Sequence, residues 1–240
     1  GVMGASIVKH LLNAGHEVTI YTRTKAKADG LIELGAKWAS SPAEASKEKQ
    51  IIFTMVGYPK DVEEVYFGID GIFSVVKEDS ILVDMTTSEP TFAKKIYNEA
   101  KNKGIHSLDA PVSGGDIGAK NGTLSLMVGG DLDIFEKMKP IFEVFGQNII
   151  YQGEAGNGQH TKMCNQIAIA SGMIGVCESM AYGLKAGLSM DEVLRSITAG
   201  AAGSWSLSNL APRILKGDLD PGFYIKHIIK DMKIALDEAE

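Results

Sequence analysis

Cysteine is scarce in this chain of 240 residues, which holds only Cys164 and Cys177. Both fall on one predicted helix, about 20 Å apart at 1.5 Å per residue, which is far too long for a disulfide. The chain therefore excludes a disulfide-stapled scaffold. We expect two buried thiols in a reducing compartment.

An excess of positive charge and long apolar runs are also lacking. The net charge is −6 and no lysine or arginine run occurs, which argues against a nucleic-acid or membrane-surface partner. No apolar run reaches the length of a transmembrane helix, and no signal peptide precedes the first motif. Since 45% of the residues are hydrophobic and 22% are charged, the composition is that of an ordinary globular protein. We expect a cytoplasmic protein without membrane or nucleic-acid partners.

The chain also lacks an initiator Met and any strand ahead of its first glycines. It opens with GVMG, residues Gly1, Val2, Met3 and Gly4, and ends in KDMKIALDEAE without a helix stop signal. We expect both ends to be cut.

An apolar stripe over 5–14 predicts a helix, and VTIY over 18–21 predicts a strand. A glycine pair, a helix and a strand form the tail of a βαβ unit. With one more strand and glycine, the start would be the dinucleotide motif G-x-G-x-x-G. In that interpretation Gly1 lets the backbone approach a pyrophosphate, and Gly4 allows close packing of helix on strand. Half of this motif is weak evidence for a dinucleotide site, because glycines are common at helix starts.

The residues after the 18–21 strand indicate which dinucleotide is preferred. NAD-binding proteins carry an acid here for the ribose 2′-hydroxyl, but this chain has Arg23 and Thr24, and no acid before Asp29. A guanidinium suits a 2′-phosphate, although a solvated basic loop is the alternative. We predict NADP, with NAD possible.

Strands and helices then alternate, which predicts a doubly wound parallel sheet over residues 1–153. Ligands bind at the carboxyl ends of such strands, where MVGYP (with Met55 and Val56), MTTSEP and APVSGG are rich in small and hydroxyl residues. Turns need the same residues, so only the set together favours a site. The predicted helices span 26–34, 60–66, 90–103 and 133–145, with a further one capped by Ser41-Pro42; the predicted strands span 37–39, 51–56, 80–84, 105–112, 123–128 and 148–151.

From about residue 154 only helical periodicity remains, which predicts an all-α second domain over 154–240. Its helices are predicted over 156–188 and 189–199, and from Tyr224 onward. The first contains GNGQHTKMCNQ, in which Lys162 is followed by Asn165 and Gln166 at i+3 and i+4, on one helix face. A lysine and an amide on one face could act together on a small oxygen-bearing substrate. A surface lysine on a core helix is the alternative.

These motifs, in this order, resemble those of the β-hydroxyacid dehydrogenase family, which includes 3-hydroxyisobutyrate dehydrogenase and the semialdehyde reductases. The resemblance spans nearly the whole chain and implies a Rossmann-type domain, truncated before its first strand, followed by the helical domain. The matching stretches are GVMG, DMTTSEP, DAPVSGG, GTLSLMVGGD, GNGQHTKMCNQ, AYGLKAGL, SWSLSN and PGFYIKHIIKDMKIAL.

The resemblance implies a role for each site residue and no metal. Lys162 matches the catalytic lysine, whose pKa must fall for it to act as an acid at neutral pH. Asn165 would orient the substrate, and Gln166 beside it is the less certain choice. The remaining matches are Ser113, Gly114 and Gly115 for the substrate carboxylate, Thr87 and Lys230 for the cofactor, and Asp231 and Phe223 for the substrate pocket.

Taken singly, several of these residues also suit a purely structural role. Thr87 could cap the helix from Pro90, and Lys230 with Asp231 could be a solvated pair. The implied activity is NADP(H)-dependent interconversion of a small 3-hydroxy acid and its semialdehyde. A catalytically silent binding or oligomerisation module is the alternative, and imine reduction is disfavoured because it usually replaces the lysine. The substrate side chain is undetermined. We expect a homodimer or homotetramer through the helical domain.

Overall fold

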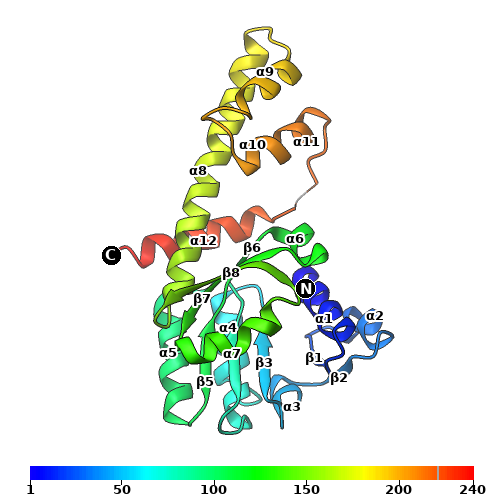
Figure 1. Cartoon of the computed structure of the whole chain (residues 1–240), viewed down its shortest axis with the longest axis vertical. Helices are drawn as coiled ribbons and strands as arrows, with labels where there is room; N and C mark the ends of the chain where they lie inside the picture. Colours follow the sequence, from blue (N-terminus) through cyan, green and yellow to red (C-terminus); the bar gives the residue numbers. More distant parts are fainter. Residues whose placement is uncertain (221) are drawn as a thin grey trace. The chain divides into compact units, whose positions relative to one another are not determined.

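The computed structural model describes residues 1–220 and 222–240 and divides the chain into two compact units. The first unit is Gly1–Met163 with Lys233–Glu240, and the second is Cys164–Met232. Two helices, α8 (Asn157–Lys185) and α12 (Ile225–Asp237), contribute residues to both units (Figure 1).

The first unit is built on three parallel strands, β3 (Ile51–Thr54), β4 (Ile81–Asp84) and β5 (His106–Asp109). All four residues of β4 are buried, because helices cover both faces of the sheet. Ile81 and Val83 join the core with α1 (Val2–Asn13) and α7 (Leu132–Phe142), while Leu82 joins the core with α4 (Pro59–Phe67) and α5 (Pro90–Asn102). The predicted Rossmann-type α/β class is confirmed.

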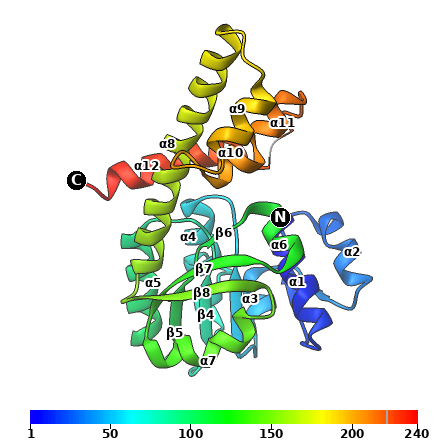
Figure 2. The same cartoon turned by 45° about the horizontal axis from the view of Figure 1, so that its top comes forward.

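The sheet is mixed rather than wholly parallel. The segment predicted as one strand over 105–112 is broken at Ala110 and Pro111 into β5 and β6 (Val112–Ser113), because proline lacks the N–H that a ladder needs. Both pieces pair antiparallel with β7 (Leu124–Gly130). On the other side of β7 lies β8 (Gly146–Gly153), in parallel register, and Figure 2 shows the two strands running alongside each other.

Strands β1 (Thr19–Tyr21) and β2 (Lys37–Ala39) form a separate parallel pair. In the described part of the chain, no strand joins this pair to β3 at the edge of the larger sheet. Apolar residues of α1 and of α2 (Asp29–Ile32) pack over the pair.

The second unit has its own apolar core. Val176 and Met180 of α8 pack against α9 (Met190–Ile197), α10 (Trp205–Asn209) and α11 (Ala211–Leu215). The unit is all-helical over the residues that the structure describes.

The structure corrects several expected elements. The helix predicted over 26–34 is split into η1 (Lys25–Lys27) and α2, and α12 ends at Asp237 rather than continuing to the last residue. Both cysteines are exposed, not buried, because the sides of α8 on which they lie are uncovered. The elements not yet given are α3 (Pro42–Ser46), η2 (Ile72–Ser74) and the unpredicted α6 (Gly115–Asn121).

Candidate active site

A buried polar network ties together the loops that follow β3 and β4. Asp84 ends β4 and accepts hydrogen bonds at Oδ1 from Thr54 Oγ1 (2.8 Å) and from the Thr86 N–H (3.0 Å). The Thr86 hydroxyl accepts from the Val56 N–H at 3.0 Å, and Thr54 also bonds the Tyr66 hydroxyl at 3.0 Å. Burial raises the pKa of Asp84 to about 6, against these hydrogen bonds, which lower it. These hydrogen bonds fix the backbone of the two loops. The same loops carry residues that are expected to contact the cofactor.

Asp109, at the end of β5, holds the start of α8. Its Oδ1 accepts from the Gly156 N–H (2.7 Å) and its Oδ2 from the Gln159 N–H (2.9 Å). N–H groups at a helix N-terminus have no partner within the helix, and the helix dipole favours a carboxylate there. Burial raises the pKa of Asp109, and the backbone N–H groups around it lower the pKa. The first turn of α8 is thereby attached to the sheet.

The attachment is close enough to exclude side chains. A Cβ on Gly158 would overlap the Met127 carbonyl oxygen and lie 2.7 Å from the Asp109 carbonyl oxygen. A Cβ on Gly129 would lie 2.6 Å from Asp109 Oδ1. Both glycines are therefore required by packing of helix on strand.

The side chain of Gln159 is fully buried and reaches the loop after β4. Its Nε2 donates to the Thr86 carbonyl oxygen (2.7 Å) and its Oε1 accepts from the Ser88 N–H (3.1 Å). Thr87 lies between these two bonded residues. Gln159 was not among the predicted site residues, although it stands three residues before the lysine in GNGQHTK.

Lys162 lies one helical turn after Gln159, on the same side of α8. It is 6% exposed, so the surface-lysine alternative is wrong. A buried lysine is uncommon and costly, which makes Lys162 a candidate functional residue.

The predicted carboxylate cradle lies at the end of β6. Ser113 is half-buried, and Gly114 (φ 125°) and Gly115 (φ 63°) have backbone conformations that favour glycine. Among the residues that the structure describes, and leaving aside the adjacent backbone, nothing lies within 4 Å of the position a Cβ would take on Gly115, so the backbone there is open to a ligand. The two glycines start α6, which the glycine-rich sequence concealed.

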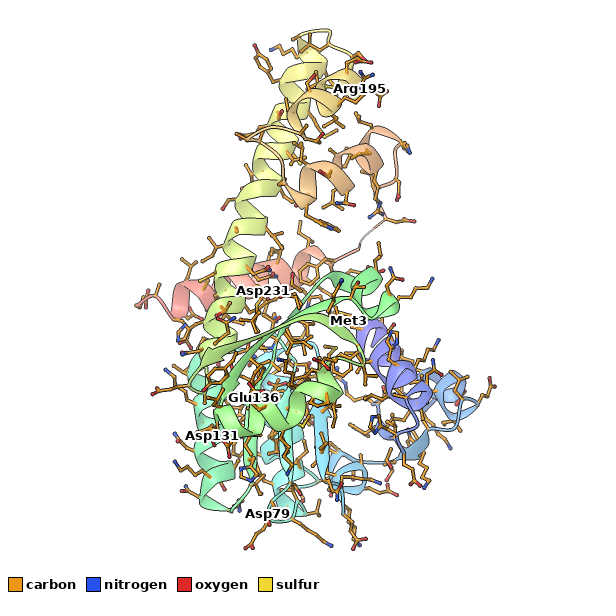
Figure 3. The ribbon with its side chains drawn as sticks, viewed as in Figure 1. Met3, Asp79, Asp131, Glu136, Arg195 and Asp231 are labelled. Atoms are coloured by element: carbon orange, nitrogen blue, oxygen red, sulfur yellow. The ribbon has the colours of Figure 1, made fainter. Side chains whose placement is uncertain are left out.

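The N-terminal glycines fit a dinucleotide phosphate. Helix α1 begins at Val2 with no side-chain cap and no acid in its first turn, which contains Met3 (Figure 3). Apart from chain neighbours and the helix's own backbone, no atom of the described residues lies within 4 Å of a Cβ placed on Gly1 or Gly4. Open backbone donors at a helix N-terminus suit an anion. The packing role expected for Gly4 concerns a strand ahead of Gly1 and stays a prediction.

Arg23, the expected 2′-phosphate residue, already has one partner. Its side chain is 72% exposed, and one guanidinium nitrogen lies 3.1 Å from Asp61 Oδ1. Asp61 is buried in the first turn of α4, where its Oδ2 accepts from the Tyr58 N–H at 3.1 Å. Thr24 caps η1, after β1, and Met55 and Val56 follow β3. Most of the Arg23 side chain faces solvent, where a phosphate can reach it.

The second unit gathers four of the expected residues. Gln166 donates to Asp231 Oδ2 at 2.5 Å and accepts from Asn165 Nδ2 at 2.8 Å. Lys230 Nζ lies 3.0 Å from Asp231 Oδ1, and Asp231 is 1% exposed on α12 (Figure 3). The solvated-pair alternative for Lys230 and Asp231 is therefore wrong. Phe223 is 53% exposed, and its ring centroid lies 5.8 Å from that of His227.

Two further features bear on possible partners. Among the described residues, no group of three or more His, Cys, Asp or Glu side chains is placed to hold a metal ion. Helix α8 is long and apolar enough to cross a membrane by length and composition alone, so the expectation that no segment reaches that length is wrong. Such a helix is weak evidence for a membrane, because core helices of soluble proteins have the same composition.

Comparison with known proteins gives matches over the whole chain. Residues 1–153 match the NAD binding domain of 6-phosphogluconate dehydrogenase, and residues 156–240 match the NAD-binding domain of NADP-dependent 3-hydroxyisobutyrate dehydrogenase. An uncharacterised oxidoreductase of Bacillus subtilis, YkwC, is 63% identical over 240 residues, covering 100% of this chain and 83% of the relative. The 2-hydroxy-3-oxopropionate reductase of Escherichia coli is 38% identical over 240 residues, covering 100% and 82%. The solved structure of Mycobacterium tuberculosis 3-hydroxyisobutyrate dehydrogenase with L-serine has a TM-score of 0.91 at 30% identity, covering 100% of this chain and 84% of that one.

Proposed function

Because the chain belongs to the 3-hydroxyisobutyrate dehydrogenase family of NAD(P)-dependent oxidoreductases, we propose that it interconverts a small 3-hydroxy acid and its semialdehyde with NADP(H). Lys162 is the general acid and base of this reaction. The observation that carries the proposal is the burial of Lys162 one turn after the fastened start of α8.

The cofactor supplies or accepts a hydride, and the protein moves the proton. In reduction, Lys162 Nζ donates a proton to the carbonyl oxygen, and in oxidation it removes one from the hydroxyl. Proton transfer by a positioned side chain contributes about 10²–10⁴-fold to the rate. Asn165, one turn further along α8, orients the substrate, while Gln166 supports Asn165 through their 2.8 Å hydrogen bond.

The substrate carboxylate is assigned to the open backbone at Ser113, Gly114 and Gly115. A hydroxyl and the N–H groups of a strand-to-helix turn form a concavity that suits an anion. L-Serine, present with the tuberculosis relative, is itself a small 3-hydroxy acid, which supports this substrate class. Phe223 and Asp231 stay predictions for the substrate pocket.

The preferred cofactor is proposed to be NADP(H). Arg23 and Thr24 replace the acid that would select NAD, and the match to the NADP-dependent dehydrogenase domain agrees with them. The remaining cofactor contacts are proposed at the backbone of Gly1–Gly4, Met55 and Val56, and at Thr87 and Lys230. Because cells keep NADPH reduced, the favoured direction is reduction, as in the Escherichia coli relative.

The two domains are assigned different tasks. Residues 1–153 are assigned to cofactor binding, and residues 154–240 to substrate binding and oligomerisation. Several large apolar side chains of α8 are exposed, among them Ile174 at 62% and Tyr182 at 76%. A helix that is apolar all round needs a cover, and a second copy of this chain presents the same surface. We propose a homodimer or homotetramer, in the cytoplasm.

The function is tested with a substrate panel. Purified protein is mixed with NADPH or NADH and with one of four substrates: glyoxylate, succinic semialdehyde, methylmalonate semialdehyde or tartronate semialdehyde. Oxidation of the cofactor is followed by absorbance at 340 nm. We expect turnover of at least one semialdehyde with a higher kcat/KM for NADPH, and Arg23→Ala reduces that preference about tenfold by removing a charged contact worth about 1.4 kcal/mol. NADPH binding without oxidation of any substrate would favour the silent binding module instead.

A further inference from the structure

The loop that carries Thr87 is held from both sides by one side chain. Gln159, 0% exposed, donates to the carbonyl oxygen of Thr86 and accepts from the N–H of Ser88, at 2.7 Å and 3.1 Å. The carboxamide of glutamine places a neutral N–H donor and a carbonyl acceptor side by side, and asparagine, the other amide, is one methylene shorter. We propose that Gln159 is a positioning residue, which sets the Thr86–Ser88 segment at a fixed place relative to Lys162. This inference rests on the proposed function.

The other end of this link is rigid. The N–H of Gln159 is itself bonded to Asp109, and the glycine at position 158 packs directly on the sheet. Lys162 stands one turn further on the same helix, so its backbone shares that rigidity. Gln159 therefore connects a fixed point on α8 to a loop, rather than joining two mobile parts.

The loop needs the link on its far side. Thr86 has further bonds, from its N–H to Asp84 and from the Val56 N–H to its hydroxyl. Ser88, which is 1% exposed, has its N–H bonded to Gln159, and Glu89 then caps α5 without a side-chain bond. Loss of the amide leaves the buried Thr86 carbonyl oxygen and the Ser88 N–H without these two bonds, which weakens the hold of α8 on the segment around Ser88. Hydride transfer is sensitive to small shifts, since a displacement of about 1 Å costs about 10²-fold in rate.

A merely structural role for Gln159 makes a different prediction. In that case a variant would lose stability, and its activity would fall only as folded protein was lost. Three variants separate the two roles. Gln159→Met keeps the length and loses both bonds, Gln159→Glu keeps the acceptor for Ser88 but loses the donor to Thr86, and Phe142→Leu is the control, since it loosens the core at a fully buried residue of α7.

The first measurement is hydrogen exchange of the peptide that contains Ser88, on the protein without cofactor. We expect Gln159→Met to raise its exchange rate at least tenfold and Gln159→Glu to raise it less, while Phe142→Leu changes it no more than other peptides of the first unit. Exchange in Gln159→Met equal to wild type would overturn the proposal.

The second measurement is kinetic, with NADPH and its 4-deuterated form. We expect kcat of Gln159→Met to fall about 10- to 100-fold, the isotope effect on kcat to rise, and KM for NADPH to change less than threefold. Phe142→Leu keeps kcat within about twofold. Equal losses of kcat in Gln159→Met and Phe142→Leu would contradict a positioning role. If wild type reduced no semialdehyde, the proposed function would fail, but the exchange rates would still decide whether Gln159 holds the segment.

Discussion

The two stretches of α8 differ in almost every physical respect. Residues 157–163 lie in the first unit, where Gly158, Gln159, Lys162 and Met163 are buried and the helix start is bonded to the sheet. Residues 164–185 lie in the second unit and leave many apolar side chains uncovered. One continuous helix thus combines a fixed polar start with a long apolar surface. The difference favours, under the proposed function, a role in the chemistry for α8 up to Gln166 and a role in assembly for its later turns.

The largest expected effect is on stability, when a glycine in each stretch of α8 is replaced by alanine and the two variants are compared. Gly158→Ala puts a Cβ against backbone and carboxylate oxygens of the sheet, and we expect it to lower the free energy of unfolding by more than about 3 kcal/mol. Gly175→Ala meets no atom within 4 Å, and we expect it to raise the free energy of unfolding by about 0.5–1 kcal/mol through helix propensity. Urea denaturation of both variants measures the contrast. Equal effects of the two substitutions would remove the distinction between the stretches.

A second prediction concerns the pH dependence of stability. The fixed start of α8 is bonded to the loop that follows β4, and the buried carboxyl of Asp84 lies at the start of this loop. In the folded protein its pKa is about 6, above the ordinary 3.8, so folding binds a proton more tightly. This contribution to stability is complete below pH 3.8 and is lost as the pH rises through 6. The difference corresponds to about 3 kcal/mol.

Asp84→Asn removes this proton-linked term. We expect the stability of the variant relative to wild type to rise by up to about 3 kcal/mol between about pH 4 and pH 8, measured by urea unfolding at each pH. The comparison cancels titrating groups that both proteins share and that do not interact with Asp84; Asp109, whose charge helps to raise the pKa of Asp84, is not one of them. A stability difference that does not vary with pH would show that Asp84 is not the group responsible.

The role of residues 164–185 in assembly is tested by introducing a charged side chain on their exposed surface. We expect Ile174→Glu to shift the oligomer toward monomer, because a carboxylate buried at an apolar interface is unfavourable. Ile69→Glu, at a side chain that is 96% exposed and outside α8, is the matched control and leaves the mass unchanged. Sedimentation velocity reports both. A wild type that is monomeric at every concentration, or association with lipid vesicles instead of a second copy, would contradict the assignment of this surface.

The sequence predicted local features better than long-range ones. The βα alternation, the start of α8 and the group around Ser113 follow from glycine placement and apolar periodicity. The antiparallel β7 did not follow, because pairing direction depends on where the chain returns. Asp109 and Gln159 were missed as links because their partners stand about 50 to 70 residues away in the chain. The exposure of Cys164 and Cys177 was missed because an apolar helix usually predicts burial.

The central proposal is that the part of α8 up to Gln166 carries the chemistry and the later turns do not. A single-turnover experiment with NADPH and the best semialdehyde compares Lys162→Ala with Ile174→Ala on the same helix. We predict that Lys162→Ala slows hydride transfer at least about 100-fold while its NADPH dissociation constant, from cofactor fluorescence, stays within about threefold. Ile174→Ala keeps the wild-type rate. A rate of hydride transfer in Lys162→Ala within threefold of wild type would contradict the claim.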